Sequence, residues 1–121
     1  MSEQWKVEHD ERQYRLMLDH LEAYREKKIG INVLISALKG LLGALELRSD
    51  DWLERAINEW GNLEISYALE LDRYEEDGRG LKEMHKRLFE MEAVKTSISN
   101  IENLARGQLD ALAWEKPCDP E

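Results

Sequence analysis

The chain has 121 residues, which is a typical length for one domain. Its 26 acidic and 17 basic residues leave a net charge of −9, which disfavours nucleic acid and anionic membrane as partners. With 42% hydrophobic residues it is too apolar for a disordered acidic segment, and one cysteine can form neither an internal disulfide nor a thiolate metal site.

The distribution of proline indicates an all-helical fold. Both prolines, Pro117 and Pro120, lie in the last five residues, and no long stretch alternates apolar and polar residues in the manner of a strand. We therefore predict an all-α protein, an antiparallel bundle of about four helices of which the last is long or bent. Residues 1–114 are expected to form a single domain and residues 115–121 a flexible C-terminal tail.

The first predicted helix runs from about Glu3 to Lys27, with a break at Gly30. The second runs from about Ile31 to Leu47. It is mostly apolar, yet shorter than a membrane span and charged at Lys39, so we expect a central core helix. It also carries a stripe of small residues, which predicts the close approach of a neighbouring helix: Asn32, Ser36, Gly40 and Gly43.

The third predicted helix runs from about Asp50 to Tyr74, with Ser49 or Asp50 as its N-cap. Its apolar arc includes Ile57 and predicts that Trp52 and Trp60 are largely buried against the second and fourth helices. A Gly-containing turn, residues 77–80, ends it.

The fourth predicted helix, from about Leu81 to Ala113, has apolar residues at near-heptad spacing. Weak helix formers between Thr96 and Asn100 mark a site for a bend or break.

The titratable residues do not form a pattern typical of catalysis or metal binding. No histidine (His9, His20 or His85) has a carboxylate three or four residues away, the spacing by which one helix presents two metal ligands. Cys118 lies in the acidic tail, where nothing would activate a thiolate. We therefore expect no enzymatic activity, no catalytic residue, no cofactor and no metal.

The negative charge is concentrated on the third helix. Residues 46–77 contain 11 acids and 3 bases, whereas the rest of the chain is nearly balanced. An acidic face can simply keep a protein soluble, but it also suits a strongly basic partner. The candidate partner-binding residues, on the side of the helix away from the tryptophans and at its ends, are Asp50, Asp51, Glu54, Asn58, Ile65, Leu69, Asp72, Glu75 and Glu76.

Ile65 and Leu69 are apolar residues on this otherwise polar side. They are either buried because the helix is sandwiched between two neighbours, or exposed as a small apolar contact with an acidic rim.

The stretch from Ile31 to Arg73 resembles small acidic helical immunity proteins of bacterial polymorphic toxin systems, including contact-dependent growth inhibition. The resemblance lies in the apolar run Ile31–Leu45 and in the pairs Asp51-Trp52, Glu59-Trp60, Leu63-Glu64 and Tyr67-Ala68, followed by Leu71-Asp72-Arg73. The chain lacks the Pro-Asp-Gly turn and following tyrosines of nuclease-colicin immunity proteins, so no interface residue is transferred from them.

The resemblance implies a cytoplasmic, non-enzymatic antidote that binds a cognate toxin domain, expected to be a basic nuclease, and covers its active site or substrate path. No direct contact with nucleic acid or membrane is expected. Two alternatives stay open: a helical structural or regulatory module that self-associates, for example as a homodimer, and an acidic mimic of nucleic acid that inhibits a nucleic-acid-binding protein.

Overall fold

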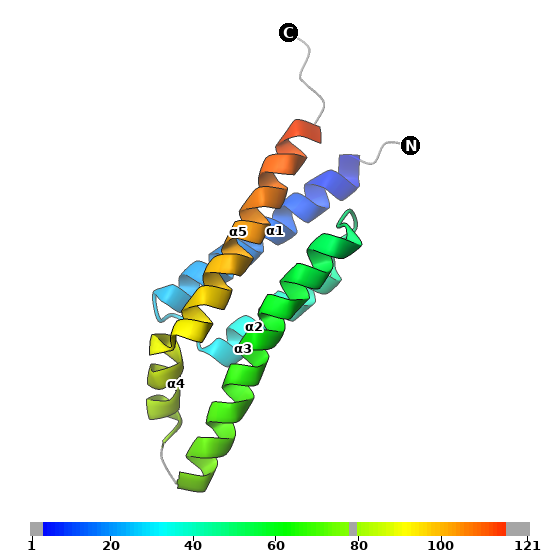
Figure 1. Cartoon of the computed structure of the whole chain (residues 1–121). Helices are drawn as coiled ribbons and strands as arrows, with labels where there is room; N and C mark the ends of the chain where they lie inside the picture. Colours follow the sequence, from blue (N-terminus) through cyan, green and yellow to red (C-terminus); the bar gives the residue numbers. More distant parts are fainter. Residues whose placement is uncertain (1–3, 78–79, 116–121) are drawn as a thin grey trace.

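A computed structural model describes residues 4–77 and 80–115, without the side chains of residues 75–77, 114 and 115. It confirms the all-α class and the antiparallel bundle. The regular structure within these residues consists of five helices (Figure 1): α1 (Gln4–Arg25), α2 (Ile31–Gly43), α3 (Asp50–Asp77), α4 (Leu81–Glu90) and α5 (Glu92–Glu115).

Four of the helices form the bundle. Helix α1 packs against α2 and α5, and α3 packs against the same two neighbours, so α1, α2, α3 and α5 surround one core. In Figure 1, α3 and α5 lie in front of α2 and α1. Helix α4 extends the bundle beyond the start of α5 and contacts α3, α2 and α5.

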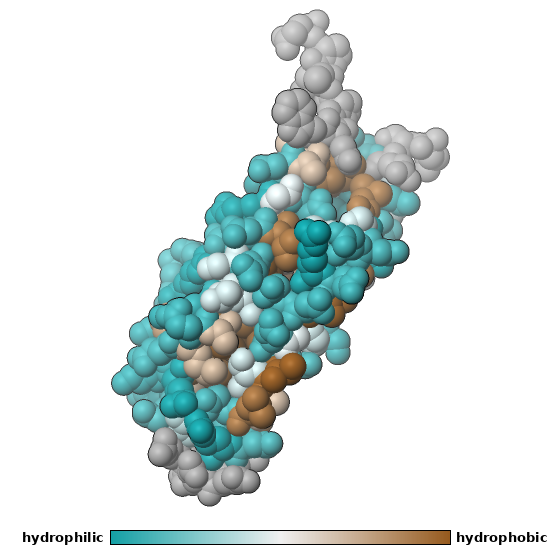
Figure 2. All heavy atoms as spheres, in the orientation of Figure 1, coloured by the Kyte–Doolittle hydropathy of each residue, from teal (hydrophilic) through white to brown (hydrophobic). Residues whose placement is uncertain are grey.

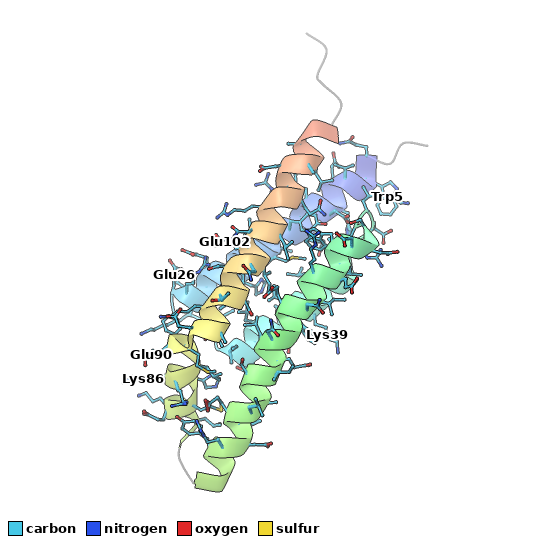
Figure 3. All side chains as sticks on the ribbon, viewed as in Figure 1. Trp5, Glu26, Lys39, Lys86, Glu90 and Glu102 are labelled. Atoms are coloured by element: carbon cyan, nitrogen blue, oxygen red, sulfur yellow. The ribbon has the colours of Figure 1, made fainter. Side chains whose placement is uncertain are left out.

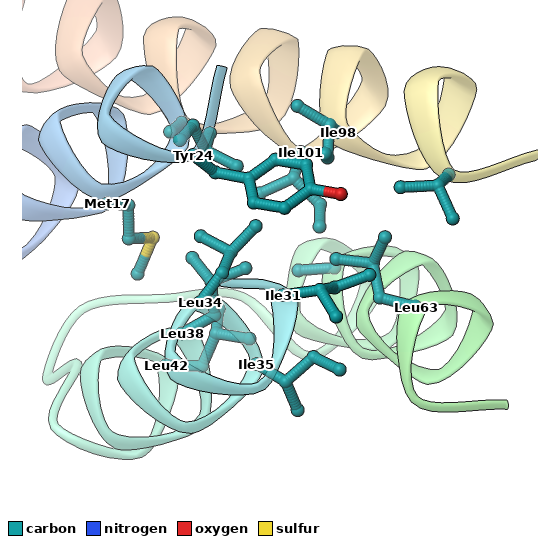
Figure 4. Close-up of a cluster of buried hydrophobic side chains, with 14 of the residues drawn as sticks. Met17, Tyr24, Ile31, Leu34, Ile35, Leu38, Leu42, Leu63, Ile98 and Ile101 are labelled. Carbon is teal, nitrogen blue, oxygen red and sulfur yellow. The ribbon is translucent and has the colours of Figure 1, made fainter. Parts of the chain in front are cut away.

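The core is mainly aliphatic, includes three buried tyrosines (Tyr14, Tyr24 and Tyr74), and draws on all five helices. Figure 4 shows Leu34 and Leu38 of α2 between Met17 of α1 and Leu63 of α3. Burial of such side chains contributes about 1.5–3 kcal/mol each before conformational entropy is subtracted. This burial, at spacings of three and four residues, selects the inner face of every helix.

The first helix ends earlier than predicted, at Arg25, and the chain reverses at Lys27 rather than at Gly30. Lys27 has a φ of 62°, and the N–H groups of Lys27 and Lys28 donate to the carbonyls of Tyr24 and Ala23. These are the two bonds of a Schellman motif, in which a left-handed residue closes the helix.

Helix α2 also ends before its predicted limit, at Gly43 rather than Leu47. The physical reason is Asp10 of α1, which is fully buried. Its two carboxylate oxygens accept hydrogen bonds from the N–H groups of Glu46 and Leu47, at 2.9 and 2.7 Å. These two N–H groups therefore bond outside the helix, and the segment after Gly43 turns toward α3.

The long last helix is interrupted, but not where the sequence predicts. The region between Thr96 and Asn100 is continuous helix, because its inner residues pack in the core and override their weak propensity. The break lies at Met91, which has an extended conformation with a ψ of 129°. The prediction of a break was right in kind and wrong in place.

Two predictions about the outer side of α2 and α3 are wrong. Ile57 is 46% exposed rather than buried, because α2 covers only part of the arc to which it belongs. The small-residue stripe of α2 does not receive a neighbouring helix. Gly40 and Gly43 are exposed, and a methyl group at either would meet no described atom within 4 Å.

The tryptophans of α3 are partly buried and anchor it to its neighbours. The Trp60 indole N–H donates to the carbonyl of Ile35 in α2 at 2.9 Å, and that of Trp52 donates to the carbonyl of Leu104 in α5 at 3.1 Å. Trp52 also meets Tyr14 of α1 edge to face. The predicted contacts are therefore present, with less burial than expected.

No helix within the described residues is both long enough and apolar enough to cross a membrane.

Candidate functional site

The start of α3 is fixed by a local cap. The Ser49 hydroxyl accepts a hydrogen bond from the N–H of Trp52 at 3.1 Å, so Ser49 is the N-cap. Asp50 and Asp51 follow in the first turn, where carboxylates are favoured by the helix dipole. Both are exposed, and Asp51 forms an ion pair with Arg55 at 3.1 Å. Their position is thus explained by helix formation alone.

The remaining polar candidates follow the outer side of α3. Glu54, Asn58 and Asp72 are all exposed. The described residues include no ion-pair partner for Glu54 or Asp72 within 4.0 Å. The side chains of Glu75 and Glu76 lie outside the described part of the chain.

Ile65 and Leu69 are on the surface, which settles their position in the free chain. Ile65 is 58% exposed and Leu69 is 66% exposed, so burial by sandwiching between two helices is wrong. Figure 2 shows the face formed by α3 and α5, with an apolar patch over the lower half of α3. One helical turn separates the two side chains, which places them side by side.

A shallow groove runs between α3 and α5 and contains these two residues. It consists of three adjoining hollows of about 400, 400 and 370 Å³. Glu59 and Asn100 line both the first and the second hollow, and Ser66 lines the second and the third. Ile65 lies in the second and Leu69 in the third. We call this surface the α3–α5 groove.

Helix α5 and the preceding Met91 supply the wall of the groove that sequence reasoning missed. Thr96 and Asn100, which the sequence suggests as a bend, instead line the groove from a continuous helix. The Asn100 amide donates to the Glu59 carboxylate at 3.1 Å and links the two walls. The available signal in the sequence was the pair of polar residues Thr96 and Asn100, whose spacing of four places them on one helix face.

The lower end of the groove is held by an ion pair. Glu70 is only 5% exposed, and Arg87 of α4 donates from Nε to its Oε1 at 2.6 Å, which ties α4 to α3. The hydrogen bond and the negative charge of Glu70 raise the pKa of the Arg87 guanidinium above its ordinary value. Arg73, which lines the groove, also lies 3.8 Å from Glu70. The basic groups near the apolar pair are thus already paired with acids.

The histidines are separated from one another in the structure. His9 donates from Nε2 to the carbonyl of Ala44 at 2.8 Å, and the Nδ1 of His20 bonds the carbonyl of Leu16 at the same distance. His85 lies on α4 beside Gly30. Among residues 4–77 and 80–115, no three His, Cys, Asp or Glu side chains are placed to share a metal ion. Cys118 lies outside the described residues.

The comparisons with known proteins give no match: no family model, no curated protein and no solved structure matches the chain. The fold and the groove geometry therefore carry the functional argument.

Proposed function

We propose that the protein is a toxin-neutralising immunity protein that binds a basic toxin domain through the α3–α5 groove and the acidic outer side of α3. The single observation that carries the proposal is the exposed pair Ile65 and Leu69 within this groove. A helix face that only meets water gains nothing from two adjacent large aliphatic side chains. Small apolar centres with polar rims are common in protein interfaces.

The charge around this pair supports a basic partner. Residues 46–77 carry 11 acids and 3 bases. Two of those bases already have acidic partners, Arg55 with Asp51 and Arg73 with Glu70. The excess of negative charge would accelerate encounter with a cationic surface, such as the phosphate-binding cleft of a nuclease.

The charge contribution is tested with the double variant Glu54→Lys/Asp72→Lys. The matched control is Asp19→Lys/Asp110→Lys, which changes the net charge equally at exposed positions on α1 and α5. The partner is first recovered with the purified chain as bait, and association is measured at low and high salt. We expect the α3 variant to slow association about tenfold at low salt and the control to change it much less. Equal effects of both variants would refute a localised acidic site.

The apolar contribution is tested with Ile65→Ala and Leu69→Ala, against Ile57→Ala as a control of the same residue type on the same helix. The two groove variants should speed dissociation about tenfold or more each, as for interface hot spots. The free protein should lose no more than about 0.5 kcal/mol, because both side chains are exposed. Unchanged dissociation from the partner would exclude the pair from the interface.

A second candidate function, a self-associating module, is favoured by one observation. Val33 on α2 and Ile57 on α3 are each 46% exposed, on helices that pack against each other. Sedimentation analysis distinguishes the two functions. A stable dimer of the purified chain that Val33→Glu converts to a monomer would support self-association, whereas a monomer at all concentrations would argue against it.

A further inference from the structure

A second surface feature lies at the end of the bundle where α1 ends and α2 and α4 begin. It is a cleft of about 850 Å³, larger than any hollow of the α3–α5 groove. Figure 3 shows Lys86 and Glu90 on α4 on the same side of the molecule as Glu26, which follows α1. The apolar wall of the cleft consists of Tyr24, Ile29 and Phe89.

The cleft is basic although the chain is strongly acidic. Four of the eight lysines in the sequence line it, against two acids, Glu83 and Glu90. Lys28 is paired with Glu26 at 3.1 Å. The other three have no carboxylate within 4.0 Å among the described residues: Lys27, Lys82 and Lys86. Lys27 instead lies over the Phe89 ring, with its Nζ 4.9 Å from the ring centroid. Positive charge without an internal carboxylate partner, in a protein with a net charge of −9, points to an anion.

Two helices begin at this cleft. Gly30 is the N-cap of α2 and Gly80 the N-cap of α4, and neither helix start has a side-chain cap. The first N–H groups of a helix have no partner within the helix, and they favour anions. The chain is tightly packed at Gly30, since a Cβ there would lie 2.8 Å from Oδ1 of Asn32 and 3.3 Å from Cε1 of His85.

An independent observation comes from two buried polar groups. Tyr24 is only 5% exposed and lines the cleft, and its hydroxyl has no hydrogen-bond partner among the described residues. The same holds for the buried Nδ1 of His85. Figure 4 shows the Tyr24 ring among apolar side chains of α2 and α5. Buried polar groups normally have a partner, so two unsatisfied groups at one cleft indicate a missing one.

We propose that this cleft binds a nucleoside phosphate. The phosphate oxygens would accept from the N–H groups at the starts of α2 and α4 and from Lys82 and Lys86. The planar base would pack on the half-buried side chains of Phe89 and Ile29, which line the cleft. The cleft volume lies in the usual range for small-ligand sites. An acidic peptide would need the charges spread along an extended track, whereas here the four lysines line a single cleft at one end of the bundle. The site is independent of the proposed toxin contact.

The proposal is tested by titrating the full chain with ATP, without divalent cations, by calorimetry and by amide NMR. Binding should shift the amide signals of Ile31, Asn32, Leu81 and Lys82. Lys82→Glu/Lys86→Glu should weaken the affinity about tenfold or more. The control Lys39→Glu/Lys95→Glu, with the same charge change on α2 and α5, should alter it less than about twofold. Tyr24→Phe should weaken it about fivefold, through the loss of one hydrogen bond.

Several results would overturn the proposal. These are the absence of ATP binding up to about 10 mM, equal losses in both lysine pairs, or shifts confined to other helices. Saturation of the same amides by a glutamate-rich peptide but not by ATP would replace the nucleotide with an acidic protein segment. Unchanged affinity of Tyr24→Phe would remove the tyrosine hydroxyl from the site.

Discussion

Asp10 offers the sharpest test of how this bundle is held in shape. It lies in α1, is 0% exposed, and accepts the N–H groups of Glu46 and Leu47 on its two carboxylate oxygens. The neighbouring His9 donates to the carbonyl of Ala44 in the same segment. Two side chains of α1 therefore position the link between α2 and α3, and with it the start of the proposed binding helix.

The magnitude follows from the two hydrogen bonds. A hydrogen bond to a charged group contributes about 1.5–3 kcal/mol, and Asp10→Ala removes two of them. Glu46 is exposed, so water can satisfy part of the loss. We therefore expect Asp10→Ala to lower the free energy of unfolding by about 3 kcal/mol, a large fraction of the stability of a small domain. Asp10→Asn keeps one oxygen acceptor and should lose about half as much.

The assay is urea unfolding followed by far-ultraviolet circular dichroism. Asp19→Ala is the control, since Asp19 is an exposed aspartate of the same helix, and it should change the stability by less than about 0.5 kcal/mol. A loss below about 1 kcal/mol in Asp10→Ala would show that the two hydrogen bonds do not hold the α2–α3 link. An equal loss in both variants would show a general effect of charge on α1.

Three further predictions concern the core and the ion pairs. The hydrogen bonds from Arg25 and Arg106 hold the pKa of Glu102 below its ordinary value of 4.5. The Glu102 carboxylate therefore stabilises the fold above pH 4.5. This stabilisation is lost as the pH falls through the lower pKa of the folded state. Glu102→Gln should therefore flatten the acid limb of a stability-versus-pH curve, and an unchanged limb would contradict it. Burial raises the pKa of Tyr24 from 10.0 to about 12, so stability should fall above pH 10 as the unfolded chain ionises first. Tyr24→Phe should remove this fall in stability at high pH. At neutral pH the variant should be equally stable or up to about 1 kcal/mol more stable, because the substitution deletes an unsatisfied hydroxyl. A clear loss of stability would reveal a partner for the hydroxyl. Trp60→Ala should cost roughly 2–3 kcal/mol in denaturant unfolding, less than a fully buried tryptophan, and a near-neutral result would contradict its contact with α2.

The helices and their inner faces could be predicted from the sequence because amphipathic periodicity is a local property. The spacing of apolar residues marks α1 and α3 whatever lies beside them, and proline occurs only at the end of the chain. The Ser49 cap is equally local, since its hydroxyl bonds an N–H three residues away. The concentration of acid on residues 46–77 is likewise a property of composition.

The tertiary structure alone decided what each helix face meets. Ile65 and Ile57 are isoleucines of the same helix, and the sequence predicts that only Ile57 lies in the core. Both side chains are exposed in the structure, because their exposure depends on where α2 and α5 lie. The end of α2 is set by Asp10, more than thirty residues earlier, which takes the N–H groups that would have extended the helix. The basic cleft joins lysines from two distant segments, residues 27–28 and 82–86. The periodicity of apolar residues shows which face of a single helix is apolar. These features arise instead from contacts between helices, so they exist only in the packed chain.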